Sequence, residues 1–183
     1  MKHIIIISSS IREGRLSHRI ALYLKQYLEE NHLATAEVLD LKSYNFPLFT
    51  ERLVYMDNPS KEVLDFAGRF VKADGVLIVS PVYNASFPAS LKNVIDLFVK
   101  EWQEKVVAVA TVTFGTNAGI ATVKELQALL LKMGAIVVPT AWTVLSAGKD
   151  FEEDGKPLDA DKTASRAQPM VRQLLDMINK LSV

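Results

Sequence analysis

The pattern of apolar and polar positions alternates between two periods along the chain. Short, mostly apolar runs are typical of strands covered on both faces, and they occur at residues 4–7, 38–41 (where Val38, Leu39 and Leu41 are apolar), 76–79, 106–112 and 135–144. Between these runs and after the last one, apolar side chains recur three or four residues apart, which indicates amphipathic helices. We expect these helices over residues 16–28, 63–71, 91–102, 123–133 and 171–181.

Local signals support several of these boundaries. Ser60 precedes the second helix and can cap it, with Glu62 in the first turn. Pro81 ends pairing of the third strand, and Pro88 favours a helix start shortly afterwards. Pro139 lies inside the last apolar run. Because proline cannot donate to a central ladder, this fifth strand is expected at a sheet edge.

Five strands alternating with five helices predict an α/β sandwich with a parallel sheet and right-handed crossovers, as one domain over residues 1–183. The flavodoxin-like doubly wound sandwich, with strand order 2-1-3-4-5 and helices on both faces, needs five strands. The larger dinucleotide-binding fold needs six strands and a G-x-G-x-x-G turn after the first, where this chain has the residues Ser8 to Arg12. We therefore predict the flavodoxin-like fold.

Composition narrows the classes of function. Lys plus Arg and Asp plus Glu both number 21, so no basic field favours nucleic acid or a membrane surface. The apolar run near the start is too short for a membrane span. The chain has no cysteine, which fits a cytoplasmic protein and leaves any redox chemistry to a cofactor. Its histidines, at positions 3, 18 and 32, fit no metal spacing.

Ligands of doubly wound sheets bind beyond the carboxyl ends of the strands, so the loops after the first, third and fourth strands carry the chemistry. The first reads SSSIREGRLSH and supplies hydroxyls, two guanidiniums and a helix amino end, which together favour an anion such as phosphate. The alternative is a polar turn with Ser17 as N-cap. Phosphoacceptor receiver domains share this topology but need a cluster of carboxylates around a divalent metal at these strand ends. Here the first strand ends in serines and the third in Ser80-Pro81, so we do not expect a receiver domain.

The loop after the third strand holds Tyr83 and Asn84 between two prolines. A stiff turn with a flat ring and an amide suits the edge and face of a planar heteroaromatic group, although Tyr83 packing on a helix and Asn84 capping the turn would explain the same residues. After the fourth strand, Gly115 and Gly119 permit a close backbone approach, and Thr116 or Asn117 can cap the next helix. An ordinary strand-to-helix loop fits that segment equally well.

These loops together resemble the NADPH-dependent FMN reductase family, over nearly the whole chain. The family's second loop reads P-E-Y-N-G/A-S, followed by P-x-x-L-K-N-x-I-D, and here it is PVYNASFPASLKNVID, with Val82 in place of the Glu. The first loop of the family reads G-S-x-R-x-x-S-x-N. Ser10 and Arg12 match it, whereas Ser9 replaces the Gly, Arg15 the second Ser and Ser17 the Asn.

The resemblance implies noncovalent FMN, with NAD(P)H as co-substrate. The FMN phosphate would lie among Ser10, Arg12, Arg15, Ser17 and His18. The ring would lie against Pro81, Val82, Tyr83 and Asn84 on one side and Phe114, Gly115, Thr116 and Asn117 on the other. Hydride would pass through the flavin to a small acceptor by ping-pong exchange, without a catalytic side chain.

The resemblance also suggests a homodimer around the third and fourth helices, with the segment 44–55 over a neighbouring flavin. Phe98 and Trp102 at the end of the third helix would serve such an interface or, alternatively, pack into the core. Two other functions remain open. A non-enzymatic flavodoxin-type electron carrier usually has a different phosphate loop and strong negative charge, and a degenerate interaction module would not need Arg12, Tyr83 and Asn84.

Overall fold

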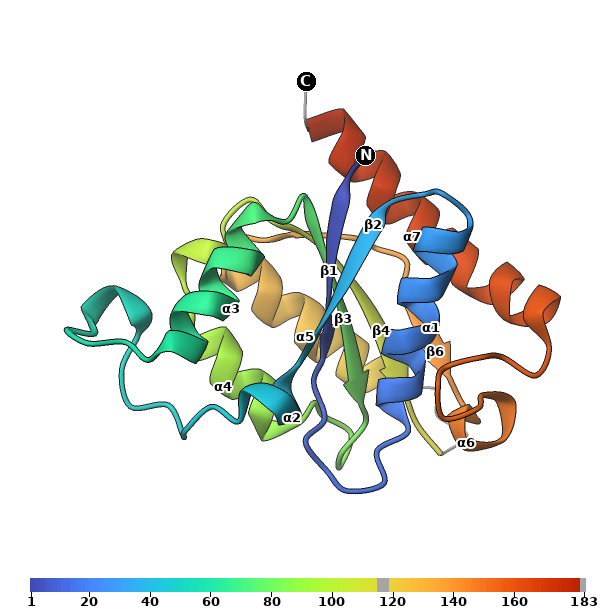
Figure 1. The fold of residues 1–183 in the computed structure, drawn as a ribbon, viewed down its shortest axis with the longest axis horizontal. Coiled ribbons are helices and arrows are strands. Elements are labelled where there is room, and N and C mark those ends of the chain that lie inside the picture. Colours follow the sequence, from blue (N-terminus) through green and yellow to red (C-terminus); the bar gives the residue numbers. More distant parts are fainter. Residues whose placement is uncertain (115–118, 182–183) are drawn as a thin grey trace.

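A computed structural model of the chain describes residues 1–114 and 119–181. Its sheet has the order β2-β1-β3-β4-β5, and all of its pairs are parallel. The central strands are β1 (His3–Ser8), β2 (Thr35–Asp40), β3 (Gly75–Pro81) and β4 (Val106–Val112) (Figure 1). The predicted flavodoxin-like order is confirmed.

The outer edge differs from the single fifth strand that the sequence predicts. Residues 136–144 form two short strands, β5 (Ile136–Val137) and β6 (Trp142–Val144), which pair with the beginning and the end of β4. The sheet therefore has six strands. Pro139 lies between β5 and β6, where its missing N–H costs no ladder bond.

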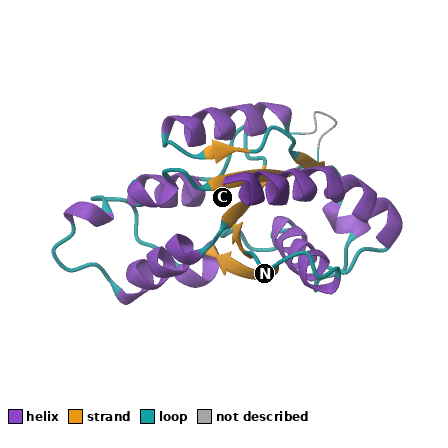
Figure 2. Ribbon diagram, turned by 90° about the horizontal axis from the view of Figure 1, so that it is seen from above, coloured by secondary structure: helices purple, strands orange, loops and turns teal. Residues whose placement is uncertain are grey.

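Helices cover both faces of the sheet. One face packs against α1 (Ser17–Glu30), α6 (Ala147–Asp150) and α7 (Ala160–Leu181), and the other against α3 (Lys61–Lys72), α4 (Ala89–Leu97) and α5 (Ile120–Lys132) (Figures 1 and 2). The run Ile4–Ile7 shows how the sequence builds both layers, because Ile4 and Ile6 enter one core and Ile5 and Ile7 the other. Two shorter elements, α2 (Leu41–Tyr44) and the 3₁₀ helix η2 (Lys100–Trp102), complete the connections on the second face.

The third predicted helix is shorter than its apolar spacing indicates. Helix α4 ends at Leu97, Phe98 follows as its C-cap residue with an extended backbone, and Trp102 lies in η2. Phe98 stacks on Phe66 with ring centroids 5.0 Å apart, and Trp102 meets Phe70 edge-on at 4.6 Å. Both side chains are buried in the core. They therefore offer no apolar surface to a second copy of the chain.

Residues 45–59, which we call the arm, extend away from the sheet beside α3 and contain the 3₁₀ helix η1 (Leu53–Tyr55) (Figures 1 and 2). The base of the arm is fixed by Asn93 of α4, whose side-chain amide accepts from the N–H of Phe49 and donates to the carbonyl of Pro47. The arm ends at Ser60, whose Oγ accepts from the N–H of Val63, so the predicted cap of α3 is confirmed. Within the described ranges, no helix is long and apolar enough to cross a membrane.

Candidate functional site

Strand register brings the predicted loops together at one end of the sheet. Ser8 at the end of β1 pairs with Asp40 of β2, and Pro81 of β3 pairs with Val112 of β4. The loops that follow these strands surround a small cavity of about 90 Å³. Its lining includes Arg12, Gly14, Arg15, Leu16, Ser17, Pro81, Val82, Tyr83, Val112 and Phe114. Seven of the predicted site residues are in this set, namely Arg12, Arg15, Ser17, Pro81, Val82, Tyr83 and Phe114.

Three other predicted residues lie close by, outside the cavity lining. Ser10 and His18 contact neighbouring loops, and Asn84 is exposed in the turn after β3. The predicted residues Gly115, Thr116 and Asn117 lie outside the described residues.

The hydroxyl groups of Ser8, Ser9 and Ser10, which follow one another at the end of β1, all bond to other groups of the protein. Ser8, Ser9 and Ser10 are fully buried. The hydroxyl of Ser8 lies 2.9 Å from Nδ1 of His18, that of Ser9 donates to the carbonyl of Val79, and that of Ser10 lies 2.7 Å from the Tyr83 hydroxyl. These bonds hold the loop rigidly against β3 and α1, so it is shaped before any ligand binds.

Ser17 and Arg12 are the groups that this loop leaves without a partner. Ser17 is the first residue of α1, with Leu16 as N-cap, so the alternative in which Ser17 caps the helix does not hold. Its Oγ is buried and has no hydrogen-bond partner, which is costly unless a ligand or water supplies one. Arg12 is exposed, and in the described part of the chain its guanidinium makes no hydrogen bond or ion pair.

Arg15 faces the cavity, but most of its donors are occupied. Nη1 and Nη2 bind the two carboxylate oxygens of Asp40, and Nη1 also donates to the carbonyl of Ser10 at 2.6 Å. The Arg15 and Asp40 side chains are only 12% and 16% exposed. Burial alone would favour the neutral acid, but hydrogen bonds from Arg15 and from the backbone of Lys42 outweigh it. The pKa of Asp40 therefore lies below its ordinary value.

His18 lies on the first turn of α1 beside this pair. Its Nδ1 is 4.0 Å from the Asp40 carboxylate and closer to Ser8. Burial and then the positive charge of Arg15 lower the pKa of His18, and Asp40 opposes them only in part. The lowered pKa favours the neutral form of His18, which lies beside the start of the loop.

The turn after β3 is a tight reversal closed by two backbone hydrogen bonds between Tyr83 and Ser86, at 2.8 and 3.0 Å. Asn84 and Ala85 between them have φ of 50° and 64°. This left-handed conformation is common for Asn and strained for Ala. The geometry leaves Asn84 exposed and the ring of Tyr83 on the cavity wall, as expected for a turn that meets a flat ligand.

The loop after β4 starts at the same cavity, at Phe114, and Gly119 at its other end lies beside Val82 of the cavity lining. Phe114 is 80% exposed. Gly119, the N-cap of α5, has φ of +66°, and a Cβ there would lie 2.7 Å from Oγ1 of Thr111 and 2.8 Å from Cγ2 of Val82. The close approach that the sequence predicts for this glycine is therefore confirmed.

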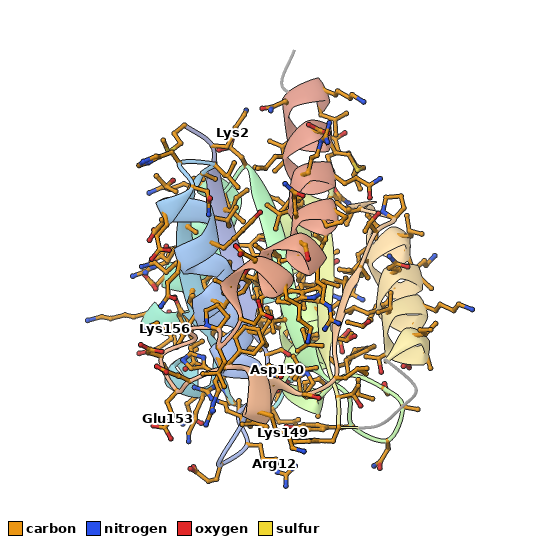
Figure 3. All side chains as sticks on the ribbon, turned by 90° about the vertical axis from the view of Figure 1, so that its right-hand side faces the viewer. Lys2, Arg12, Lys149, Asp150, Glu153 and Lys156 are labelled. Atoms are coloured by element: carbon orange, nitrogen blue, oxygen red, sulfur yellow. The ribbon has the colours of Figure 1, made fainter. Side chains whose placement is uncertain are left out.

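Sequence reasoning missed two parts of the site. Asp40 ends β2 as a lone carboxylate, and its position one strand from the serine run is the signal that could have revealed its partner Arg15. The sequence pattern also predicts no helix at residues 147–150, where the structure has α6. A Cβ at its Gly148 would lie 2.9 Å from Leu16, so α6 packs closely beside the first loop. Arg12 and Lys149 lie at the same end of the molecule, opposite Lys2 (Figure 3).

Comparison with known proteins shows the family to which the chain is related. A sequence model of the NADPH-dependent FMN reductase family matches residues 2–150. The chain belongs to this family. It is 32% identical over 146 residues to the NAD(P)H-dependent FMN reductase LOT6 of Saccharomyces cerevisiae, covering 72% of this chain and 75% of that protein.

Two further relatives extend over more of the chain. A quinone reductase of Pseudomonas putida is 26% identical over 93% of this chain and 89% of its own length. Among solved structures, the flavoenzyme NAD(P)H:(acceptor) oxidoreductase FerB of Paracoccus denitrificans superposes with a TM-score of 0.81, at 26% identity, over 98% of both chains. The FMN reductase family thus accounts for the fold and for the general activity, that of an oxidoreductase that uses FMN and NAD(P)H.

The residues present fit FMN. Its phosphate would meet the unpartnered Ser17 hydroxyl and Arg12, and its ring would meet the Tyr83 turn and Phe114. In the described ranges, no cluster of three or more His, Asp or Glu side chains could hold a metal ion.

Proposed function

We propose that this FMN reductase passes electrons from NAD(P)H to a small organic acceptor by ping-pong exchange, with FMN held by the three loops that surround the cavity. Bound FMN would accept a hydride from NAD(P)H and pass the electrons on after NAD(P)⁺ leaves. The single observation that carries the proposal is the Ser17 hydroxyl, which is buried without a partner in the first turn of a 14-residue helix.

The first turn of α1 suits a phosphate for two reasons. The first N–H groups of a helix have no partner within it, and the helix dipole adds partial positive charge there. The exposed Arg12 guanidinium would supply the full charge that a phosphate dianion needs. Arg15 lines the cavity, and together with His18 and Ser10 it would hold the loop in place.

The other loops would hold the ring. The backbone of Pro81, Val82 and Tyr83, continued by Asn84, would lie along one edge, and Phe114 would lie along another. No acid or base is required at the ring, because hydride transfer needs only stacking and orientation. The acceptors that we propose are quinones first, since the Pseudomonas putida relative is a quinone reductase, and then azo compounds, nitroaromatics, metal oxyanions or free flavin.

We also propose a homodimer in which the arm of one copy lies over the flavin of the other. The arm carries several exposed apolar side chains, Leu48 at 83%, Tyr55 at 66% and Val54 at 50%. Apolar side chains gathered on a projecting segment favour a protein partner. The exposed ring of Phe114 would be covered in the same assembly.

Anaerobic reduction of the purified protein tests the proposal. We expect a flavin absorbance spectrum, bleaching by NAD(P)H, and reoxidation on adding a quinone. Initial rates at several quinone concentrations should give parallel double-reciprocal lines. Intersecting lines would exclude ping-pong exchange, and a bound flavin that NAD(P)H does not reduce would indicate an electron carrier. Failure of the apoprotein to bind FMN would overturn the proposal as a whole.

A further inference from the structure

We infer that Asp40 is a positioning residue of the phosphate site, which acts through Arg15 to hold the loop of residues 10–17 in its binding shape. The inference rests on the proposed FMN site and adds to it a division of labour between the two arginines. Arg12 supplies charge to the phosphate, whereas Arg15 serves as a clamp between the loop and β2.

The clamp follows from strand register. Ser8 and Asp40 are direct partners at the ends of β1 and β2, so the loop that leaves β1 passes beside the Asp40 carboxylate. Arg15 reaches back across this loop, binding both Asp40 oxygens and the carbonyl of Ser10. One guanidinium thus ties the start of the loop, its end and the neighbouring strand. A shift of register by one residue would move Asp40 to the other face of the sheet and remove the anchor.

Burial makes the clamp rigid. Both side chains are mostly shielded from water, and a bidentate arginine–carboxylate pair fixes direction as well as distance. Asp40 is itself held in place as the N-cap of α2, because it accepts from the N–H of Lys42 at 3.0 Å. The hydroxyl of Ser43 donates to its second oxygen at 3.4 Å. The carboxylate is therefore a fixed point to which the loop is attached.

The charges of the pair decide which arginine meets the phosphate. Three of the five N–H groups of Arg15 are used by Asp40 and Ser10, and the Asp40 charge offsets that of the guanidinium. A phosphate that bound Arg15 as its main partner would have to compete with a buried carboxylate. The guanidinium of Arg12 has no such competitor in the described part of the chain, and the Ser17 hydroxyl is unpartnered. These two groups are the better phosphate ligands.

The test compares FMN with riboflavin, which carries the same ring and lacks the phosphate. Apoprotein variants are titrated with each ligand, with flavin fluorescence as the readout. Asp40→Asn removes the charge and keeps a side chain that can still cap α2. We expect it to weaken FMN binding about tenfold and riboflavin binding less than about twofold. Asp40→Glu, which retains the carboxylate, should recover part of the loss.

Arg15→Gln provides an independent check, and it carries the test if Asp40→Asn does not fold. It should weaken FMN binding to a similar degree, and the double variant should bind no more weakly than the weaker single variant, because both changes break one interaction. Asp176→Asn is the matched control. It removes a carboxylate 3.8 Å from Arg172 on α7, remote from the loop, and should leave both affinities unchanged.

Other outcomes overturn the inference in distinguishable ways. If Asp40→Asn binds FMN more tightly, the freed Arg15 is a phosphate ligand and Asp40 its competitor. Unchanged FMN binding, or equal losses for FMN and riboflavin, would show that Asp40 has no special role toward the phosphate. These three results leave the proposed function intact. A wild-type apoprotein that binds neither ligand would instead remove the proposed function and the inference together.

Discussion

The hydroxyl oxygens of Ser10 and Tyr83 lie 2.7 Å apart, joining the loop after β1 to the turn after β3. Through this bond the side of the site proposed for phosphate is connected to the side proposed for the ring. Tyr83→Phe keeps the ring and removes the bond. A hydrogen bond of this kind contributes about 1 kcal/mol, so FMN binding should weaken by about fivefold. Fluorescence titration measures the change, with Tyr27→Phe near the far end of α1 as control. Unaltered affinity would mean that the two loops are positioned independently.

Arg12→Ala tests the main charge of the proposed phosphate site. A hydrogen bond to a charged group is worth about 1.5–3 kcal/mol, so FMN binding should weaken at least about tenfold. The thermal stability of the apoprotein should hardly change, because Arg12 is exposed and its guanidinium makes no contact in the described ranges. Arg166→Ala on α7 is the control and should bind FMN like the wild type. Equal affinity of the Arg12 variant would refute the assignment.

Gly119→Ala should destabilise the protein. The new Cβ would lie 2.7 Å from Oγ1 of Thr111, in a backbone conformation with φ of +66°. Left-handed strain and overpacking together should lower the free energy of unfolding by about 2 kcal/mol or more. Gly68→Ala on α3 provides the matched comparison. It has no neighbour within 4 Å and should raise stability by up to about 1 kcal/mol. Urea denaturation measures both, and equal midpoints for the two variants would contradict the packing argument.

His18 gives the stability of the apoprotein a pH dependence. Its folded pKa is lowered, chiefly by burial and then by the charge of Arg15. As pH falls below the ordinary value of 6.5, the unfolded chain takes up a proton that the folded chain still refuses, so stability is lost. Above that value, the contribution is fully present. His18→Gln should therefore show a smaller fall in melting temperature between about pH 7 and pH 5.

The control for this experiment is His32→Asn. His32 is exposed beyond the end of α1 with φ of 54°, a conformation that Asn tolerates. It should leave the slope of melting temperature against pH unchanged. A His18 variant with the slope of the wild type would show that the half-buried imidazole does not couple to folding.

The arm should carry the association of two copies. We expect a dimer by light scattering at micromolar concentration. Leu48→Glu, which places a charge on the most exposed apolar side chain of the arm, should shift the protein toward monomer. Leu158→Glu changes another exposed leucine, which precedes α7, and should remain dimeric. A monomeric wild type would refute the assembly.

The central strands were predictable because buried strands of a parallel sheet are continuous apolar runs, and Ile4–Ile7 is such a run. The sequence predicts a third helix that is longer than α4, because apolar residues continue at helical spacing beyond Leu97. Phe98 and Trp102 keep a helical spacing, yet they reach the core from an extended residue and from a 3₁₀ helix. Periodicity reports which side chains are buried, and it does not fix the backbone that carries them.

The candidate site was predictable where a loop motif fixes the backbone, as at Tyr83 and Asn84. It was not predictable where partners come from different strands. Asp40 gives no local sign that it meets Arg15, because their contact depends on the register of β1 and β2. Likewise, nothing in the serine run reveals that Ser9 is used internally whereas Ser17 lacks a partner.

The divided outer edge of the sheet has a consequence for behaviour at high concentration. Strands β5 and β6 comprise only two and three residues, and Pro139 between them has no N–H to offer. An exposed edge polymerises when it presents a long, regular row of backbone groups to a strand from another molecule. This edge presents two short rows with an interruption. Fibre growth by strand addition is therefore disfavoured at this edge, and no charged side chain is needed to prevent it.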